Sequence, residues 1–213
     1  MGINFQEILL MLPAILFGLS FHEFCHAYVA VKLGDDTPRS QNRLTLNPLA
    51  HFDPIGFLML IIARFGWAKP VEINPQAFKH PRRDEVLVSL AGPLANLITA
   101  VVFVFIIRFS IGSLGRMATY GQYIFDMLQY FVVINLGLMI FNLLPIPPLD
   151  GSHLIFVVLP DRWIHFKIGL YRYGSIALLG VIVLERVTNL DLLPIGKAVF
   201  AIYSGLFRMV GLG

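Results

Sequence analysis

Residues 20–27 read SFHEFCHA, and the chain around them is apolar, with ILLMLPAILFGL at 8–19 and YVAV at 28–31. Because this stretch is long enough to cross a bilayer as one helix, it is predicted to place two histidines and a glutamate at membrane depth. An ionisable side chain near the bilayer centre costs roughly 2.5–3.5 kcal/mol, so such groups usually face the protein interior and carry a function. The stretch therefore predicts a membrane fold with a polar site inside it.

The composition of the whole chain also indicates a membrane protein. Of its 213 residues, 57% are hydrophobic and 14% are charged, whereas about 25% are charged in ordinary soluble domains. This excludes a water-soluble globule, so we expect an all-α polytopic membrane protein embedded in a lipid bilayer. The length allows about four to six membrane segments, including short re-entrant or interfacial helices. We expect one domain over 1–213, with its core at about 6–160 and C-terminal helices at 165–213.

Hydropathy and helix-start residues predict where the helices lie. Spanning helices are expected at about 6–33, 82–109, 123–144 and 173–187, and shorter helices at 55–66 and 152–160. A further helix is expected within 195–213, either as a last span or as an interfacial helix. RLTLNP and WAKPVEINP alternate in polarity, so they are predicted to pair as a small β-sheet near the membrane surface. His51, in the polar loop between these segments, is expected at the surface.

Positive charge predicts the orientation in the membrane. The connection at 34–83 contains seven basic residues, namely Arg39, Arg43, Arg64, Lys69, Lys79, Arg82 and Arg83, whereas 112–122 contains only Arg116. Basic connections stay in the cytoplasm, so we expect 34–83 on that side and the N-terminus outside. The same distribution accounts for the net charge of +3 without a nucleic-acid partner.

The two histidines are spaced as two ligands of one metal. At about 100° per residue, His22 and His26 differ by roughly 40° around the helix axis, so both imidazoles leave the same face. Glu23 lies next to that face. H-E-x-x-H on a helix is a zinc-binding pattern in which the glutamate acts as a general base. The alternative is a polar pair that bonds to a neighbouring helix.

A third ligand is offered by FNLLPIPPLDG at 141–151. Catalytic zinc takes three protein ligands and leaves the fourth position for water. The three prolines break helical hydrogen bonding, and irregular backbone at membrane depth is tolerated only inside protein or against a water-filled cavity. Such a turn is predicted to aim Asp150 inward, at a depth similar to that of His22 and His26, roughly 10 Å below the cytoplasmic surface.

Taken together, these motifs resemble the site-2 protease family of intramembrane zinc metallopeptidases, in the compact prokaryotic form without regulatory domains. The resemblance covers about residues 10–160. It rests on the order and spacing of HEFCH at 22–26, SLAGPLAN at 89–96 and N-x-x-P-x-P-x-L-D-G at 142–151. GWAKPVEINP at 66–75 is similar to a loop of the same proteins.

The family implies one Zn²⁺ per chain, with His22, His26 and Asp150 as its ligands and Glu23 as the catalytic base. It further implies that Asn142 helps to hold the substrate. Asn96 in the GPLAN motif is a second candidate for substrate binding, although hydrogen bonding between helices is the default expectation for Asn96 and Asn135. The implied reaction is hydrolysis of a peptide bond in or near a transmembrane segment of another membrane protein. The implied location is a prokaryotic cell membrane, with the active site nearer the cytoplasmic side.

Two other classes of protein also place such residues in membrane spans. A metal transporter is expected to show inverted halves and polar residues along a path through several helices, whereas this sequence has one cluster and no inverted repeat. A catalytically inactive membrane scaffold is expected to lack Glu23 or a ligand, and none is missing. Cys25 points away from His22 and is expected to be a small buried hydrophobe. Gly92 is expected to allow close helix packing.

Overall fold

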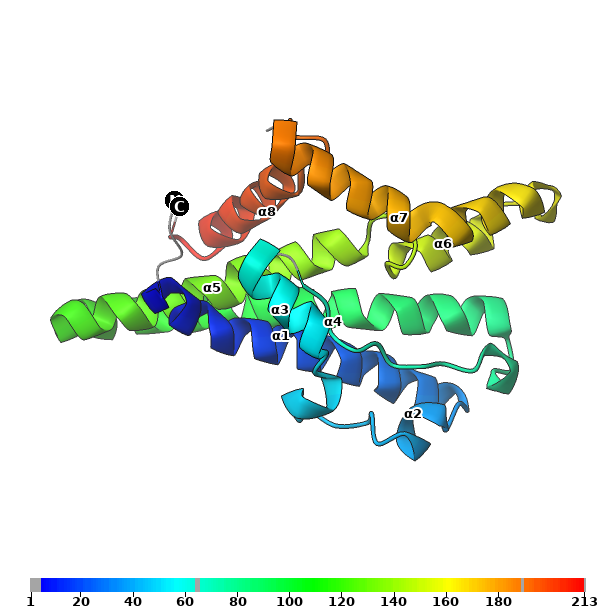
Figure 1. The fold of residues 1–213 in the computed structure, drawn as a ribbon. Coiled ribbons are helices and arrows are strands. Elements are labelled where there is room, and N and C mark those ends of the chain that lie inside the picture. The colour runs from blue at the N-terminus through cyan, green and yellow to red at the C-terminus, as the bar shows by residue number, and fades with distance from the viewer. Residues whose placement is uncertain (1–4, 64–65, 189, 213) are drawn as a thin grey trace.

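The computed structural model describes residues 5–63, 66–188 and 190–212, and in these ranges it contains helices and loops but no β-strand. The long helices are α1 (Phe5–Leu33), α4 (Pro81–Leu114), α5 (Ala118–Asn142) and α7 (Ile164–Thr188). The shorter ones are α2 (Thr37–Ser40), α3 (Pro54–Ala63), α6 (Gly151–Val158) and α8 (Ile195–Met209) (Figure 1). In the part of the chain that is described, four helices are long and apolar enough to cross a membrane, and they correspond to α1, α4, α5 and α7.

The core of the fold is a bundle in which α4 packs against both α1 and α5. Val104 and Ile107 of α4 meet Val132 and Leu136 of α5, and all four side chains are buried. The amphipathic helix α8 lies along α5 and adds Phe207 to this core. At 15 residues, α8 is not among the candidate spans, which agrees with the interfacial alternative. Helix α1 thus packs against both α4 and α5, which also pack against each other.

The helices predicted from hydropathy are confirmed, with shifted ends. The predicted end of the 55–66 helix falls at residues 64 and 65, which lie outside the described ranges, as does the side chain of Arg64. Helix α7 begins at Ile164, nine residues before the predicted start at 173. Its first turns contain Lys167 and Arg172, whose long side chains can follow an apolar surface while the charge reaches water. Hydropathy therefore placed the start of this helix too late.

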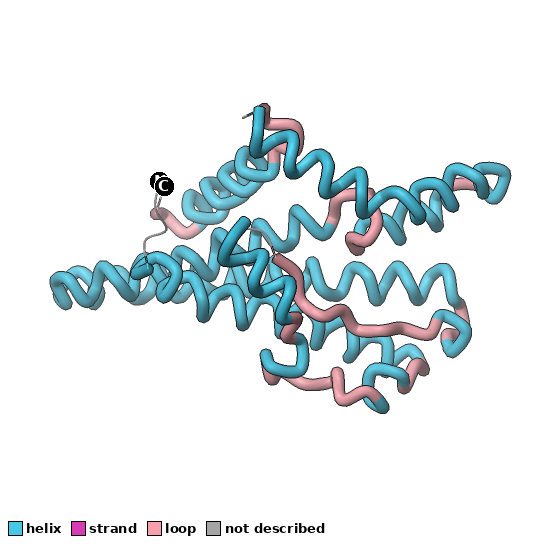
Figure 2. The backbone as a smooth tube through the Cα atoms, in the orientation of Figure 1, coloured by secondary structure: helices cyan, strands magenta, loops and turns pink. Residues whose placement is uncertain are grey.

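The predicted pairing of RLTLNP with WAKPVEINP is wrong for the described residues. Residues 66–74, called the extended segment below, form one continuous loop between α3 and α4 (Figure 2). Its N–H groups bond to α1 and the turn that follows: Val71 donates to the Glu23 carboxylate at 3.0 Å, and Asn74 donates to Asp35 at 2.7 Å. Because these donors are already used, a second strand is not needed to satisfy them.

The expectation of a surface position for His51 is also wrong, because this residue is only 2% exposed. Its Nε2 lies 2.9 Å from the carbonyl oxygen of Thr45, and its own carbonyl accepts a hydrogen bond from the N–H of Lys69 at 2.9 Å. The His51 side chain thus holds RLTLNP in a folded-back loop, and its backbone anchors the start of the extended segment. The polar neighbours of His51 in the sequence did not reveal this role.

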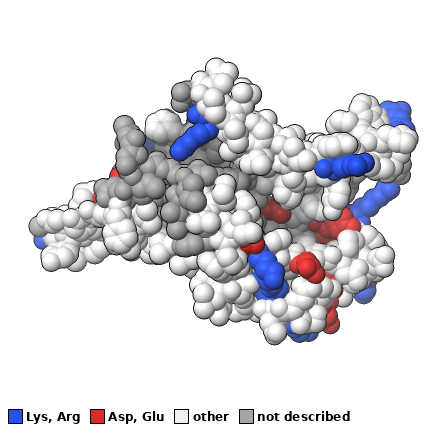
Figure 3. Space-filling model, viewed as in Figure 1, with Lys and Arg blue, Asp and Glu red and all other residues white. Residues whose placement is uncertain are grey.

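Charged side chains gather at one end of the bundle. On the face shown in Figure 3, Lys and Arg lie mostly near α2 and the connection between α6 and α7, and few lie at the opposite end of α4 and α5. A helix bundle with one strongly basic end is the pattern expected of a polytopic protein with a preferred orientation.

Candidate metal centre

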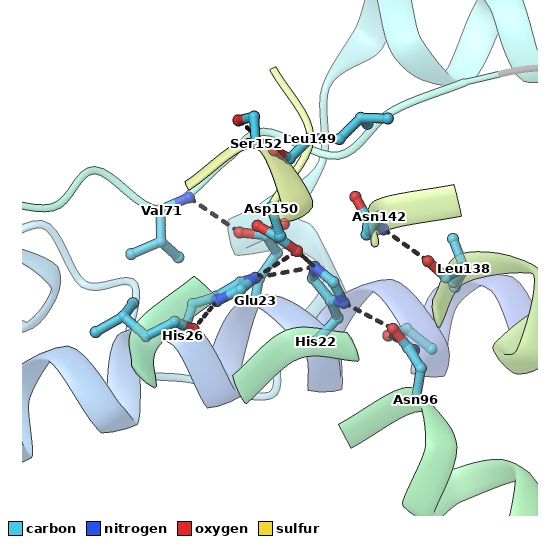
Figure 4. A network of polar contacts seen from close by, with 12 residues as sticks. His22, Glu23, His26, Val71, Asn96, Leu138, Asn142, Leu149, Asp150 and Ser152 are labelled. Atoms are coloured by element: carbon cyan, nitrogen blue, oxygen red, sulfur yellow. Dashed lines mark hydrogen bonds and ion pairs between the residues drawn. The ribbon is translucent and has the colours of Figure 1, made fainter. Parts of the chain in front are cut away.

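Three side chains from distant parts of the sequence meet inside the bundle. His22 and His26 are buried on one face of α1, and Asp150 lies in the turn between α5 and α6. One ligand atom from each lies within 4.8 Å of the other two. The Asp150 Oδ2 atom is 3.2 Å from His22 Nε2 and 3.3 Å from His26 Nε2, and the two Nε2 atoms are 2.9 Å apart (Figure 4). The predicted convergence of these three residues is thus observed.

The other nitrogen of each imidazole determines which tautomer is present. His26 Nδ1 lies 2.7 Å from the backbone carbonyl oxygen of Val88, and His22 Nδ1 lies 2.6 Å from the side-chain oxygen of Asn96. Both of these oxygens accept hydrogen bonds, so each Nδ1 carries the proton and donates it. In the neutral rings, each Nε2 atom then has a lone pair and no proton.

This arrangement leaves three acceptors facing one another. Two Nε2 lone pairs and the buried Asp150 Oδ2 share one space, and Oδ2 has no hydrogen-bond partner among the described residues. Uncompensated acceptors in an apolar interior are costly, whereas a bound cation satisfies all of them at once. Neutral imidazole nitrogen and carboxylate oxygen are both common ligands of zinc. The donor set therefore fits Zn²⁺.

Gly92 of α4 keeps the space between the imidazoles open. A Cβ atom at this position would lie 2.3 Å from His26 Nε2 and 2.6 Å from His22 Nε2. Any side chain would therefore enter the volume that the three acceptors share. The expectation of close packing at Gly92 is confirmed, but the neighbours that require the glycine are the two imidazole rings.

The turn that presents Asp150 is tightly packed. Helix α5 ends at Asn142, and Gly151, the residue after Asp150, packs against that end. A Cβ at position 151 would lie 2.2 Å from the carbonyl oxygen of Leu143. The Ser152 hydroxyl donates to the Leu149 carbonyl at 2.7 Å. These contacts fix the start of α6 against the end of α5, which holds the Asp150 carboxylate over the histidines (Figure 4).

Glu23 lies on the same side of α1 as the imidazoles but outside the group of three acceptors (Figure 4). Its side chain is 9% exposed, and one carboxylate oxygen accepts the N–H of Val71 at 3.0 Å. A carboxylate that is held by one hydrogen bond keeps further lone pairs for a proton. Sequence reasoning missed the Val71 contact, because a backbone N–H has no residue-type signal.

The two candidate substrate-binding asparagines are placed differently. Asn96 is fully buried behind His22, and its NH₂ group donates to the Gly18 carbonyl at 3.1 Å and to the Asn135 side chain at 2.8 Å. Asn142 is half-buried and donates to the carbonyl of Leu138 at 3.0 Å in its own helix. Neither belongs to the group of three acceptors, and substrate contact by either residue stays a prediction.

Comparisons with known proteins identify the family. Residues 109–181 match the model of Peptidase family M50. The chain is 43% identical over 147 residues to "Putative zinc metalloprotease YwhC" of Bacillus subtilis, which covers 68% of this chain and 67% of that protein. It is 35% identical over 147 residues to "Putative zinc metalloprotease Rip2" of Mycolicibacterium smegmatis, covering 67% of this chain and 54% of that protein.

An archaeal relative extends the similarity. "Putative zinc metalloprotease MJ0611" of Methanocaldococcus jannaschii is 31% identical over 148 residues, covering 69% of each protein. No solved structure matches the chain. The metalloprotease relatives, the apolar helices and a buried donor set that fits zinc agree with one another. The chain belongs to peptidase family M50 and is an intramembrane zinc metalloprotease.

Proposed function

We propose that His22, His26 and Asp150 are the zinc ligands and that Glu23 is the general base. The reaction is hydrolysis of a peptide bond in or near a transmembrane segment of another membrane protein. The observation that carries this proposal is the meeting of three lone-pair acceptors with no hydrogen between them. Glu23 directly follows His22 in the sequence and lies on the same side of α1 as both histidines, yet it is not needed to complete the donor set.

Each group has one chemical task in the proposed mechanism. Zinc supplies Lewis acidity, which lowers the pKa of a water molecule and polarises the scissile carbonyl. Glu23 accepts a proton from the attacking water and passes it to the leaving nitrogen as the C–N bond breaks. The products are a carboxylic acid and an amine, which together ionise to a carboxylate and an ammonium group. The Val71 N–H holds one carboxylate oxygen of Glu23, which orients the base for both transfers.

An apolar cavity supports a membrane segment as the substrate. The cavity has a volume of about 350 Å³ and is lined by α1, α5 and the extended segment, including Leu16, Ser20 and Phe141. Ser20 lies one helical turn before Glu23, and Phe141 precedes Asn142. The cavity thus accepts apolar side chains next to the proposed reaction site. Because a helix hides its peptide bonds, we propose that the substrate unwinds and adds as a strand to the extended segment.

We assign the two asparagines separate tasks. Asn142 comes directly after Phe141, which lines the cavity, and it lies near Asp150 in Figure 4. We therefore propose that its amide turns from Leu138 to donate to the substrate or the developing oxyanion. Asn96 is fully buried and bonds to His22 Nδ1. This contact supports a role in orienting the ligand better than a contact with substrate.

We also propose that the protein lies in the cell membrane with the metal centre nearer the cytoplasm. The basic connection at 34–83 follows α1 on the side where His26 lies, seven residues before the helix ends at Leu33. Seven residues of helix span roughly 10 Å, so the metal centre is shallow from that side and deep from the other.

The first prediction tests whether the space between the three acceptors is where the metal binds. Wild type is expected to contain roughly one zinc per chain. Gly92→Ala places a methyl group among the three acceptors, so the purified variant is expected to lose most of this zinc. Gly112→Ala is the matched control, because Gly112 lies in the same helix and a Cβ there meets no atom of the described residues within 4 Å. Zinc content by mass spectrometry and helicity by circular dichroism are measured for all three. If folded Gly92→Ala protein had the same zinc content as wild type, the three acceptors would not be the metal ligands.

The second prediction tests the general base. In Glu23→Gln the amide oxygen still accepts the Val71 N–H, and all three proposed ligands remain, so zinc content is expected to match wild type. The amide cannot accept the proton, so cleavage of transmembrane peptides is expected to fall by about 10² to 10⁴. Glu7→Gln, at an exposed position of the same helix, is the control and is expected to retain activity. Full cleavage by zinc-loaded Glu23→Gln would exclude Glu23 as the base.

The third prediction tests the orientation by labelling single cysteines in intact cells. In a Cys25→Ala background, Arg116→Cys is expected to react with a membrane-impermeant maleimide and Gln76→Cys to be protected. Both positions are exposed, so a difference in labelling reports the side of the membrane on which each position lies. The opposite pattern would place the metal centre near the outer face.

A further inference from the structure

We propose that Asn135 of α5, acting through Asn96 of α4, fixes the tautomer of His22 and thereby keeps the Nε2 lone pair directed at the metal. Asn135 is fully buried, lies outside the group of three acceptors and does not line the apolar cavity, so it is a positioning residue. The inference rests on the zinc-ligand role proposed above for His22. It adds a residue on a third helix to the machinery of the site.

The contacts form one continuous chain across three helices. Asn135 Nδ2 donates to the backbone carbonyl of Phe131 at 2.8 Å, and Asn135 Oδ1 accepts Asn96 Nδ2 at 2.8 Å. The second hydrogen of Asn96 Nδ2 goes to the carbonyl of Gly18 at 3.1 Å. Asn96 Oδ1 then lies 2.6 Å from His22 Nδ1. Every polar atom of both amides is thus used.

The donor-to-acceptor direction of this series of hydrogen bonds follows from the groups at its ends. The carbonyls of Phe131 and Gly18 can only accept, so the NH₂ groups of Asn135 and Asn96 must face them. The oxygen of Asn96 is therefore left for His22 Nδ1, which must donate. A histidine that donates from Nδ1 has its lone pair on Nε2, as a metal ligand requires. The backbone carbonyls of Gly18 on α1 and Phe131 on α5 thus determine the tautomer of His22.

Burial makes this direction hard to reverse. Asn96 and Asn135 both have 0% exposed surface, so water cannot replace a lost partner. Turning either amide over would bring two oxygens face to face, each without a hydrogen. The fit is also close, because a Cβ on Gly18 would lie 3.0 Å from Asn135 Oδ1. Glycine at position 18 lets α1 pass near enough for its carbonyl to join the network.

Zinc affinity of Asn135 variants tests the proposal, measured by competition with a chelator of known affinity. Asn135→Leu removes the acceptor for Asn96, so the affinity is expected to fall about 10-fold. This is the low end of the 10–100-fold range for partners of metal-bound histidine, because the Gly18 carbonyl still holds one Asn96 hydrogen. Asn135→Asp is expected to stay near wild type, since a buried carboxyl group is held neutral and can both donate to Phe131 and accept from Asn96.

The matched control is Gln129→Leu, six residues earlier in α5. Gln129 also makes a side-chain hydrogen bond between helices, to the Tyr203 hydroxyl at 3.0 Å, but it has no link to His22. Its loss is expected to leave zinc affinity unchanged. Equal zinc affinity in wild type, Asn135→Leu and Gln129→Leu would overturn the proposal. Wild type that binds no zinc would instead overturn the ligand set.

A second measurement reads the tautomer of His22 in the wild-type protein itself. Nitrogen-15 NMR of histidine-labelled, zinc-free wild type reports which ring nitrogen carries the proton. His22 is expected to be protonated at Nδ1, and its resonance is assigned by comparison with His22→Gln. A proton on Nε2 of neutral His22 would contradict the direction of the chain and overturn the proposal.

Discussion

Within an apolar helix bundle, two imidazole nitrogens and one carboxylate oxygen face a common space, and none of them has a hydrogen to give the others. This constraint explains features that are otherwise unrelated. It requires a cation, it requires a residue without a side chain at Gly92, and it requires a turn that returns Asp150 to α1 from the end of α5. These requirements follow from burial in the bundle, because water at the site could donate hydrogen bonds to the three acceptors.

The same burial gives the amides of the bundle their importance. In water, an asparagine can exchange partners at little cost, but Asn96 and Asn135 are fully enclosed. Their hydrogen bonds join α1, α4 and α5 at a single level of the bundle, next to His22. Sliding or rotating any of the three helices would leave several polar groups unsatisfied. The network therefore sets the register of the bundle as well as the orientation of a proposed ligand.

Much of this could be predicted from the sequence, because the strongest signals are local. A helix face with His22 and His26 follows from their spacing alone, and hydropathy located every long helix. Asp150 was predictable because prolines force a turn in an otherwise apolar segment. The hydrogen-bond partners were not predictable: Val88, Gly18 and Val71 contribute backbone groups, which any residue type provides. His51 was misjudged because polar neighbours in the sequence do not show which way a loop folds.

Local alternation also misled the prediction at the extended segment. Its pattern resembles a strand, yet the N–H groups of Val71 and Asn74 bond to the side chains of Glu23 and Asp35 and not to a second strand. Glu23 and the extended segment are thus coupled. The group proposed to move protons is held by the segment proposed to receive the substrate, so substrate binding and orientation of the base depend on the same piece of backbone.

X-ray absorption spectroscopy at the zinc edge tests the central claim most directly, on full-length wild-type protein purified with about one zinc per chain. The structure predicts a first shell of nitrogen and oxygen only, at about 2.0–2.1 Å, with the multiple scattering of about two imidazoles. A sulfur scatterer at about 2.3 Å, which only Cys25 or a methionine can supply, would contradict this ligand set. A shell without imidazole scattering would contradict it equally.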